Sequence, residues 1–243
     1  MYSLLIKEIN GFFSSVTGYL VIIVFLLVNS LFLWVFPGDM NILEGGYANL
    51  DPLFLLAPWV FLFLVPAVSM RMFSEENRSG TLEFLMTKPL HNMQIVMAKY
   101  LAGLILVLFS LLPSLIYYYS VHSLGKPAGN LDSGGILGSF IGLFFLASVY
   151  TSIGIFASSL TGNQIIAFLV GIVLSFLVYT GFDYVASIGY FSPVEETIMK
   201  LGINEHYKSM SRGVLDSRDL VYFVCVNLIF LFFTRTRLQS WKL

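Results

Sequence analysis

The chain has very little charge for its length. Only 11% of its 243 residues are Asp, Glu, Lys or Arg, and the formal net charge is -1, whereas a soluble globular protein carries roughly 25% charged residues. A surface this poor in charge cannot face water over its whole area, and the lack of a basic excess excludes a nucleic-acid-binding protein. A single cysteine, Cys225, excludes a disulfide framework and a thiolate metal site.

Sequence motifs for catalysis and for nucleotide binding are also lacking. A phosphate-binding loop needs Ser or Thr after Gly-Lys, but Gly125-Lys126 is followed by Pro127. The zinc motif His-Glu-x-x-His and the nucleophile motif Gly-x-Ser-x-Gly do not occur, and the three histidines are widely spaced. We therefore expect no catalytic residue, no metal site and no cofactor in this chain.

Long apolar runs are what the sequence has instead. Hydrophobic residues make up 57% of it, and a helix needs about 20 mostly apolar residues to cross the hydrocarbon of a bilayer. Six runs approach that length without the period-two polarity of barrel strands, and they predict an all-α polytopic membrane protein with a single domain over residues 1–243. The predicted spans are residues 18–36, 52–70, about 99–121, 136–160, 165–182 and about 220–234. No span has a central ionisable residue, which argues against an ion-coupled carrier.

Residues 1–16 have the pattern of an amphipathic helix in the membrane interface. The apolar positions recur every three or four residues, and they are Tyr2, Leu5, Ile9, Phe12 and Val16. The opposite side is polar and consists of Ser3, Lys7, Asn10 and Ser14. The alternative is that this stretch only prolongs the first span, and Lys7, Glu8 and Asn10 argue against it.

The distribution of basic residues predicts cytoplasmic termini. With six spans the termini share one side of the membrane, and that side holds Lys7, Arg71, Arg78, Lys88, Lys99, Arg235, Arg237 and Lys242. The other side holds Lys126, Lys200, Lys208, Arg212 and Arg218. Eight against five favours the first side as the cytoplasmic one.

The loop after the second span, residues 72–90, is the most informative stretch. Gly80 breaks a charged strip and Pro89 closes the segment. Between them Leu82, Leu85 and Met86 have the i, i+3, i+4 spacing of an apolar helical stripe. The stretch therefore predicts a short cytoplasmic helix that packs on a membrane neighbour or fits the groove of a partner.

The string Phe-x-Glu-Glu-x-Arg-x-Gly-Thr-Leu-Glu-x-Leu-x-x-x-Pro-Leu, from Phe73 to Leu90, closely resembles the first coupling-helix motif of ABC-2-type transporter permeases. Residues 158–164 are similar to the cytoplasmic turn between the fourth and fifth spans of that family, and the resemblance covers essentially the whole chain. Within the family, the chain is most similar to the gliding-motility ABC transporter permease subunits of Bacteroidota.

The resemblance implies a permease subunit, most often of an exporter, in the bacterial inner membrane. A separate ATPase subunit would bind ATP and Mg²⁺, dock on the coupling helix and hydrolyse ATP. The implied docking residues are Glu75, Glu76, Arg78, Gly80, Thr81, Leu82, Glu83 and Leu85. Further implied partners are membrane lipid, a second permease, identical or related, and periplasmic components of a gliding-motility system.

Two other regions have a predicted structural role. Residues 187–219 are rich in polar residues, and we expect short helices there, which the resemblance places in the outer leaflet. Gly134, Gly138 and Gly142 fall four apart at the start of the fourth span, which permits close helix packing either inside the subunit or against a second permease. The alternative to a transporter is a membrane scaffold that anchors an ATPase or motility components without moving a substrate.

Overall fold

The computed structural model describes residues 1–127, 129–187, 195–213 and 216–240. Within this part of the chain the elements are helical and no strand is present. The first half of the chain forms α1 (Tyr2–Phe13), α2 (Val16–Ser30), α3 (Asp51–Ser69), α4 (Arg71–Arg78), α5 (Thr81–Met86), α6 (Asn92–Leu111) and α7 (Leu115–Leu124). The second half forms α8 (Ser133–Leu160), α9 (Gln164–Phe176), α10 (Phe182–Ser187), α11 (Glu195–Met199), α12 (Ile203–Ser211) and α13 (Ser217–Gln239).

Among the residues that the structure describes, six continuous helical stretches are long and apolar enough to cross a membrane. They are residues 16–35, 51–78, 92–124, 133–160, 164–187 and 217–239. The prediction of an all-helical polytopic membrane protein is confirmed. The third stretch begins seven residues before the predicted Lys99, and the sixth begins three residues before Leu220 and ends five after Thr234. The sixth begins earlier because the Asp216 side chain caps it: its Oδ1 accepts a hydrogen bond from the Arg218 N–H at 2.9 Å.

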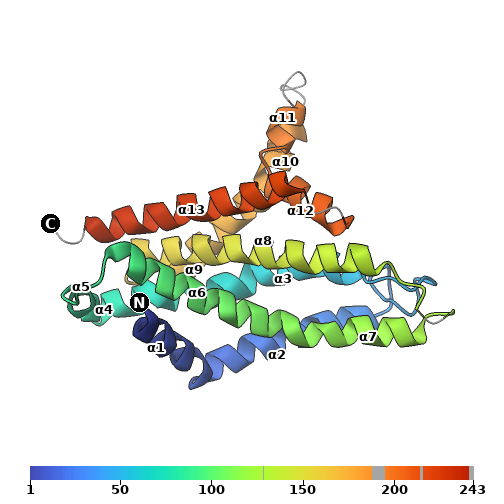
Figure 1. The fold of residues 1–243 in the computed structure, drawn as a ribbon, viewed down its shortest axis with the longest axis horizontal. Coiled ribbons are helices and arrows are strands. Elements are labelled where there is room, and N and C mark those ends of the chain that lie inside the picture. Colours follow the sequence, from blue (N-terminus) through green and yellow to red (C-terminus); the bar gives the residue numbers. More distant parts are fainter. Residues whose placement is uncertain (128, 188–194, 214–215, 241–243) are drawn as a thin grey trace.

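α8 is the central helix of the bundle. It contacts α3, α6, α9, α12 and α13, and Figure 1 shows it running between α13 on one side and α6 with α3 on the other. In an apolar stretch of 18 residues within α8, 72% of the residues are buried. In the corresponding stretches of the first, fifth and sixth spans, only 28% are buried. Those three spans therefore present most of their apolar side chains outward, where lipid or another protein covers them.

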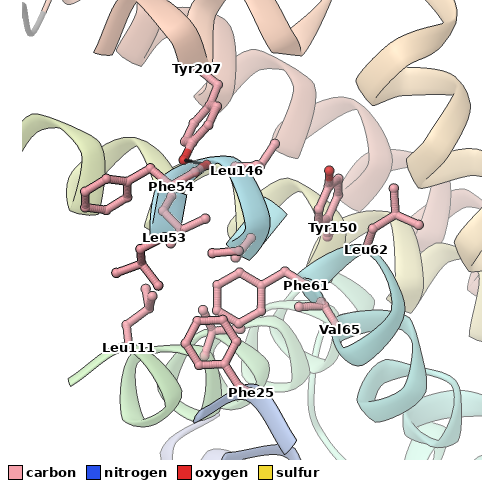
Figure 2. Packing of buried hydrophobic residues seen from close by; sticks show 14 of the residues in the cluster. Phe25, Leu53, Phe54, Phe61, Leu62, Val65, Leu111, Leu146, Tyr150 and Tyr207 are labelled. Carbon is pink, nitrogen blue, oxygen red and sulfur yellow. Dashed lines mark hydrogen bonds between the residues drawn. The ribbon is translucent and has the colours of Figure 1, made fainter. Parts of the chain in front are cut away.

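Aromatic side chains fill much of the core between the spans. The rings of Phe25 and Phe61 stack with centroids 4.4 Å apart and planes 7° apart, and Figure 2 shows them face to face. Tyr150 of α8 is fully buried. The Tyr207 hydroxyl donates a hydrogen bond to the Phe54 carbonyl oxygen at 2.8 Å. The hydrogen bond of this buried tyrosine thereby holds α12 against α3.

The two ends of the bundle differ (Figure 1). One end holds α1, α4, α5 and the last turns of α13, and we call it the α5 end. The other holds α12 and the end of α7, and we call it the α12 end. Residues 188–194 and 214–215 of the predicted outer region, and Lys242, lie outside the described residues; the described part of that region includes α11 and α12.

The buried face of α1 matches the predicted apolar stripe in part. Phe12 is buried, and Leu5 and Ile9 are partly buried against the same cluster, which Leu4 also joins. Tyr2 is 76% exposed, and Val16, which lies in α2, is 78% exposed. α1 packs on α6, where Glu8 Oε1 lies 3.0 Å from Nζ of the buried Lys99. The helix is therefore oriented by an ion pair as well as by apolar contact.

Candidate functional site

The predicted cytoplasmic segment is two helices joined by a tight turn. α4 continues directly from the second span and α5 follows the turn at Gly80, whose φ of +69° is left-handed. Glycine adopts this conformation without the steric cost that other residues meet. The Ser79 and Thr81 hydroxyls are 2.8 Å apart across the turn. The backbone therefore reverses at the position that the charged strip and Gly80 mark in the sequence.

The apolar stripe of α5 faces this chain's own core. Leu82 is 5% and Leu85 6% exposed, and both belong to the same apolar cluster as Phe73 and Ile95. The spacing of the stripe allowed packing either on a membrane neighbour or on a partner, and the resemblance implied docking; in the structure both leucines pack on the spans. The large exposed side chain of α5 is that of Phe84, which is 74% exposed. Phe84 lies off the Leu82–Leu85 stripe, and the apolar spacing did not single it out.

The exposed residues around the turn form what we call the α5 surface. Its members are Arg78, Gly80, Thr81, Glu83 and Phe84. Glu75 is exposed beside it and pairs with Arg71, with Nε and Oε2 3.4 Å apart. Five of the eight implied docking residues (Glu75, Arg78, Gly80, Thr81 and Glu83) are accordingly accessible to a partner, and Leu82, Leu85 and most of Glu76 are not.

A buried lysine lies behind this surface. Lys99 of α6 is 1% exposed, and its Nζ is 3.0 Å from Oε1 of Glu8 and 3.0 Å from Oε1 of Glu76. The ammonium also lies 5.1 Å from the centroid of the Phe73 ring. The apolar pattern predicted that the third span begins near Lys99. In the structure α6 begins at Asn92, so Lys99 lies about two helical turns inside that helix. It joins α1, α4 and α6 through one charge.

Lys7 completes the cluster on its exposed side. Its Nζ is 3.4 Å from Oε1 of Glu76 and 3.6 Å from Oε1 of Glu8. Burial on its own lowers the pKa of Lys7, but the two carboxylates outweigh burial, so the pKa is raised. The cluster pairs two cations with two anions, which limits the desolvation penalty of the buried charge. Oε2 of Glu76 is buried without a hydrogen-bond partner in the structure.

Ser158 of α8 holds the junction between α3 and α4. Its hydroxyl oxygen accepts from the backbone N–H groups of Phe73 at 2.9 Å and Ser74 at 3.0 Å, and it donates to the Met70 carbonyl at 2.8 Å. Those N–H groups lie in the first turn of α4, where a helix has no partners of its own. A residue 85 positions away from Phe73 therefore caps α4. The sequence analysis singled out the stretch from Ser158, but only as a turn.

Two of the three spaced glycines pack against α12. A Cβ on Gly138 would lie 2.6 Å from the Met210 carbonyl oxygen, and one on Gly142 would lie 3.1 Å from the Met210 Cβ. A Cβ on Gly134 would meet only Asp132 Oδ1, at 3.5 Å. Gly138 and Gly142 thus contact an element inside the subunit. Among the described residues, no group of three or more His, Cys, Asp or Glu side chains is placed to hold a metal ion.

Comparison with known proteins addresses the identity of this bundle. No curated protein was found to match the chain. A family model described as "ABC-2 family transporter protein" matches residues 38–211, which takes in the spans from α3 to α9, the α4–α5 turn and α12. This family comprises membrane transport components, and its permeases work with an ABC ATPase subunit. The chain, a multi-pass membrane protein with six apolar spans, belongs to the ABC-2 transporter family.

Proposed function

We propose that this chain is the permease subunit of an ATP-driven ABC-2-type exporter, and that a separate ATPase subunit docks on the α5 surface. The observation that carries the docking assignment is Phe84, an aromatic side chain 74% exposed on a helix whose neighbouring leucines are buried. Aromatic residues, Phe among them, are enriched at protein interfaces relative to the rest of the surface. The exposed Glu83, next to Phe84 in α5, and the exposed Arg78 at the end of α4 give the α5 surface charge of both signs, which favours a selective contact.

The contacts that hold the α5 surface in place also connect it to several spans, as the transmission of movement from a docked ATPase requires. The Lys99 cluster fastens α4 to α1 and α6, and Ser158 fastens it to α8. A displacement of the α5 surface is thereby passed to several spans at once, because packed helices move as rigid bodies. The proposed topology places this end and both termini in the cytoplasm, in agreement with the basic residues counted above, and a second permease, identical or related, completes the pathway.

The test is co-purification of the ATPase encoded beside this gene, together with its ATPase rate in proteoliposomes. Phe84→Asp and Glu83→Lys should each reduce binding and stimulation by at least about tenfold, because both change the proposed contact. Tyr47→Asp is the matched control, since Tyr47 is 81% exposed in the loop between the first two spans at the opposite end. Unchanged binding in Phe84→Asp would disprove the docking assignment. An ATPase that binds and is not stimulated would favour the scaffold instead.

We also propose a role in gliding motility in the inner membrane, with periplasmic components as further partners. The support is the similarity of the sequence as a whole to the permease subunits of that system. Deletion of the gene should abolish spreading over a surface, and the wild-type gene should restore it, whereas the gene with Phe84→Asp should not. Normal spreading after deletion would remove the motility role and leave the permease assignment intact.

A further inference from the structure

A histidine at the α12 end links α12 to the sixth span. Nδ1 of His206 lies 2.7 Å from Oδ1 of Asp219 on α13, and Nε2 lies 2.9 Å from the Lys200 carbonyl oxygen. The ring stacks on Tyr222 of α13, with centroids 3.9 Å apart and planes 20° apart. The side chains of His206 and Asp219 are 18% and 8% exposed. One ring thus contacts α13 and the segment that leads into α12.

Both ring nitrogens of His206 face hydrogen-bond acceptors. A backbone carbonyl has no proton to give, so Nε2 must carry the hydrogen of its bond to Lys200. A neutral ring then has only a lone pair at Nδ1, and that lone pair would face a carboxylate oxygen at 2.7 Å. Two lone pairs at this distance repel each other. Both contacts are hydrogen bonds at once only when a second proton lies between Nδ1 and Oδ1.

We propose that His206 and Asp219 form a proton-dependent latch that holds α12 on the sixth span at the α12 end. With two protons on the ring and an ionised carboxylate, the pair has no net charge and both hydrogen bonds are made. Loss of the second proton leaves an uncompensated carboxylate that is mostly buried, which is costly. The pair then separates, and α12 loosens from α13 as the pH rises.

The charged groups around the latch are largely paired among themselves. On the side of α11, Lys200 Nζ lies 2.7 Å from Oε1 of Glu196. On α12 itself, Lys208 and Glu205 are 3.4 Å apart. From α10, Asp183 accepts from the Asn204 amide at 2.6 Å. On α13 the titratable groups next to the ring are Asp219 and Tyr222, with Arg218 adjacent in sequence, and from the turn Leu177–Gly181, which contacts α12, the titratable residue is Tyr179.

The attachments of α12 to α3 and α8 involve no histidine or carboxylate among the described residues. Tyr207 donates to the Phe54 carbonyl, Ser139 of α8 donates to the Ser211 carbonyl at 3.1 Å, and Met210 rests on Gly138 and Gly142. These contacts persist when the ring loses its proton. The latch therefore controls the side of α12 that meets α13, while the side that meets α8 stays in place.

The experiment is amide hydrogen exchange of the full chain in lipid nanodiscs at about pH 6 and about pH 9, the range that brackets histidine titration, with rates corrected for intrinsic exchange. Protection of residues 203–211 should fall at least about tenfold at the higher pH, the factor for losing one hydrogen bond to a charged group. Nitrogen-15 spectra of the histidine rings, assigned by the loss of one signal in His206→Gln, should show the doubly protonated form at the lower pH.

Three variants separate the latch from general packing. His206→Phe keeps an aromatic ring on Tyr222 but makes neither hydrogen bond, so protection should be low at both pH values. Asp219→Asn supplies an amide that donates to a neutral Nδ1, so protection should be high at both. His122→Gln, at the end of α7, should behave as the unmodified chain. Equal protection of the unmodified chain at both pH values, or a singly protonated His206 ring at the lower one, would overturn the proposal.

Discussion

Nζ of Lys99 and Oε1 of Glu76 lie 3.0 Å apart, although one residue is in the third span and the other is in α4, at the end of the second. The same ammonium is equally close to Glu8 of α1. Three helices that are separate in the sequence thus share one buried charge.

We predict that Lys99→Met lowers the free energy of unfolding by about 3–5 kcal/mol, because it leaves the mostly buried Glu8 and Glu76 with only the exposed Lys7 as counter-ion. The measurement is denaturant unfolding in detergent micelles. Lys99→Met combined with Glu8→Gln and Glu76→Gln should lose less than Lys99→Met alone, since no uncompensated buried charge remains. Lys88→Met, an exposed lysine beyond α5, is the control. A Lys99→Met chain as stable as this control would show that the cluster contributes nothing.

Removing the Ser158 hydroxyl should loosen the start of α4. Ser158→Ala leaves the N–H groups of Phe73 and Ser74 without their acceptor, which costs about 1–3 kcal/mol. Hydrogen exchange should then speed up at residues 73–74, ahead of global unfolding. Ser159→Ala is a close control, because Ser159 is also buried but bonds only to the Phe156 carbonyl of its own helix. Similar exchange in the two variants would contradict the capping role.

The contact of α8 with α12 should be sensitive to a single methyl group at Gly138. Gly138→Ala brings a Cβ to 2.6 Å from the Met210 carbonyl oxygen, and such overpacking costs about 1–3 kcal/mol. Thermal unfolding and the exchange of α12 amides measure the effect. Gly134→Ala should change neither, because the added methyl meets only the flexible Asp132 side chain. A stable Gly138→Ala chain with well-protected α12 would refute the packing described here.

The turn before α5 should tolerate substitution poorly. Gly80→Ala places a Cβ in a left-handed conformation, at a cost of about 1–2 kcal/mol, and the strain is relieved by moving α5. Binding of the ATPase should therefore weaken although no charged or aromatic side chain of the α5 surface has changed. Gly80→Asn should weaken it less, since Asn adopts this conformation more readily. Gly11→Ala, in a helix with open space around the added methyl, should leave binding unchanged.

Sequence patterns were sufficient to predict the helix bundle but not the polar contacts between its helices. Apolar runs fix the number and approximate place of the spans, because the thickness of the hydrocarbon sets the length of a spanning helix. They underestimated the second, third and sixth spans, which include charged residues toward their ends. Lys99 and Asp219 are tolerated there because Glu8, Glu76 and His206 are brought beside them, and pairing across 91 positions, as between Glu8 and Lys99, leaves no periodic signal.

For the α5 surface, the spacing of Leu82 and Leu85 showed which face of the helix is apolar but not what would cover it. An apolar stripe has the same spacing whether it packs on its own subunit or on a partner. The buried position of both leucines decides that question, and it turns attention to Phe84. The charged residues Glu83 and Arg78 are exposed, as their solvation in either arrangement requires.

The burial of Leu82 and Leu85 also determines how an encounter at the α5 surface would proceed. A helix that folds only when it meets its receptor loses conformational entropy at that moment, and its affinity is reduced accordingly. α5 is already folded onto the spans before any such meeting. The approaching protein finds a rigid platform, so the strength of the contact depends on the few side chains that protrude from it, and those side chains are free to diverge between relatives without endangering the fold.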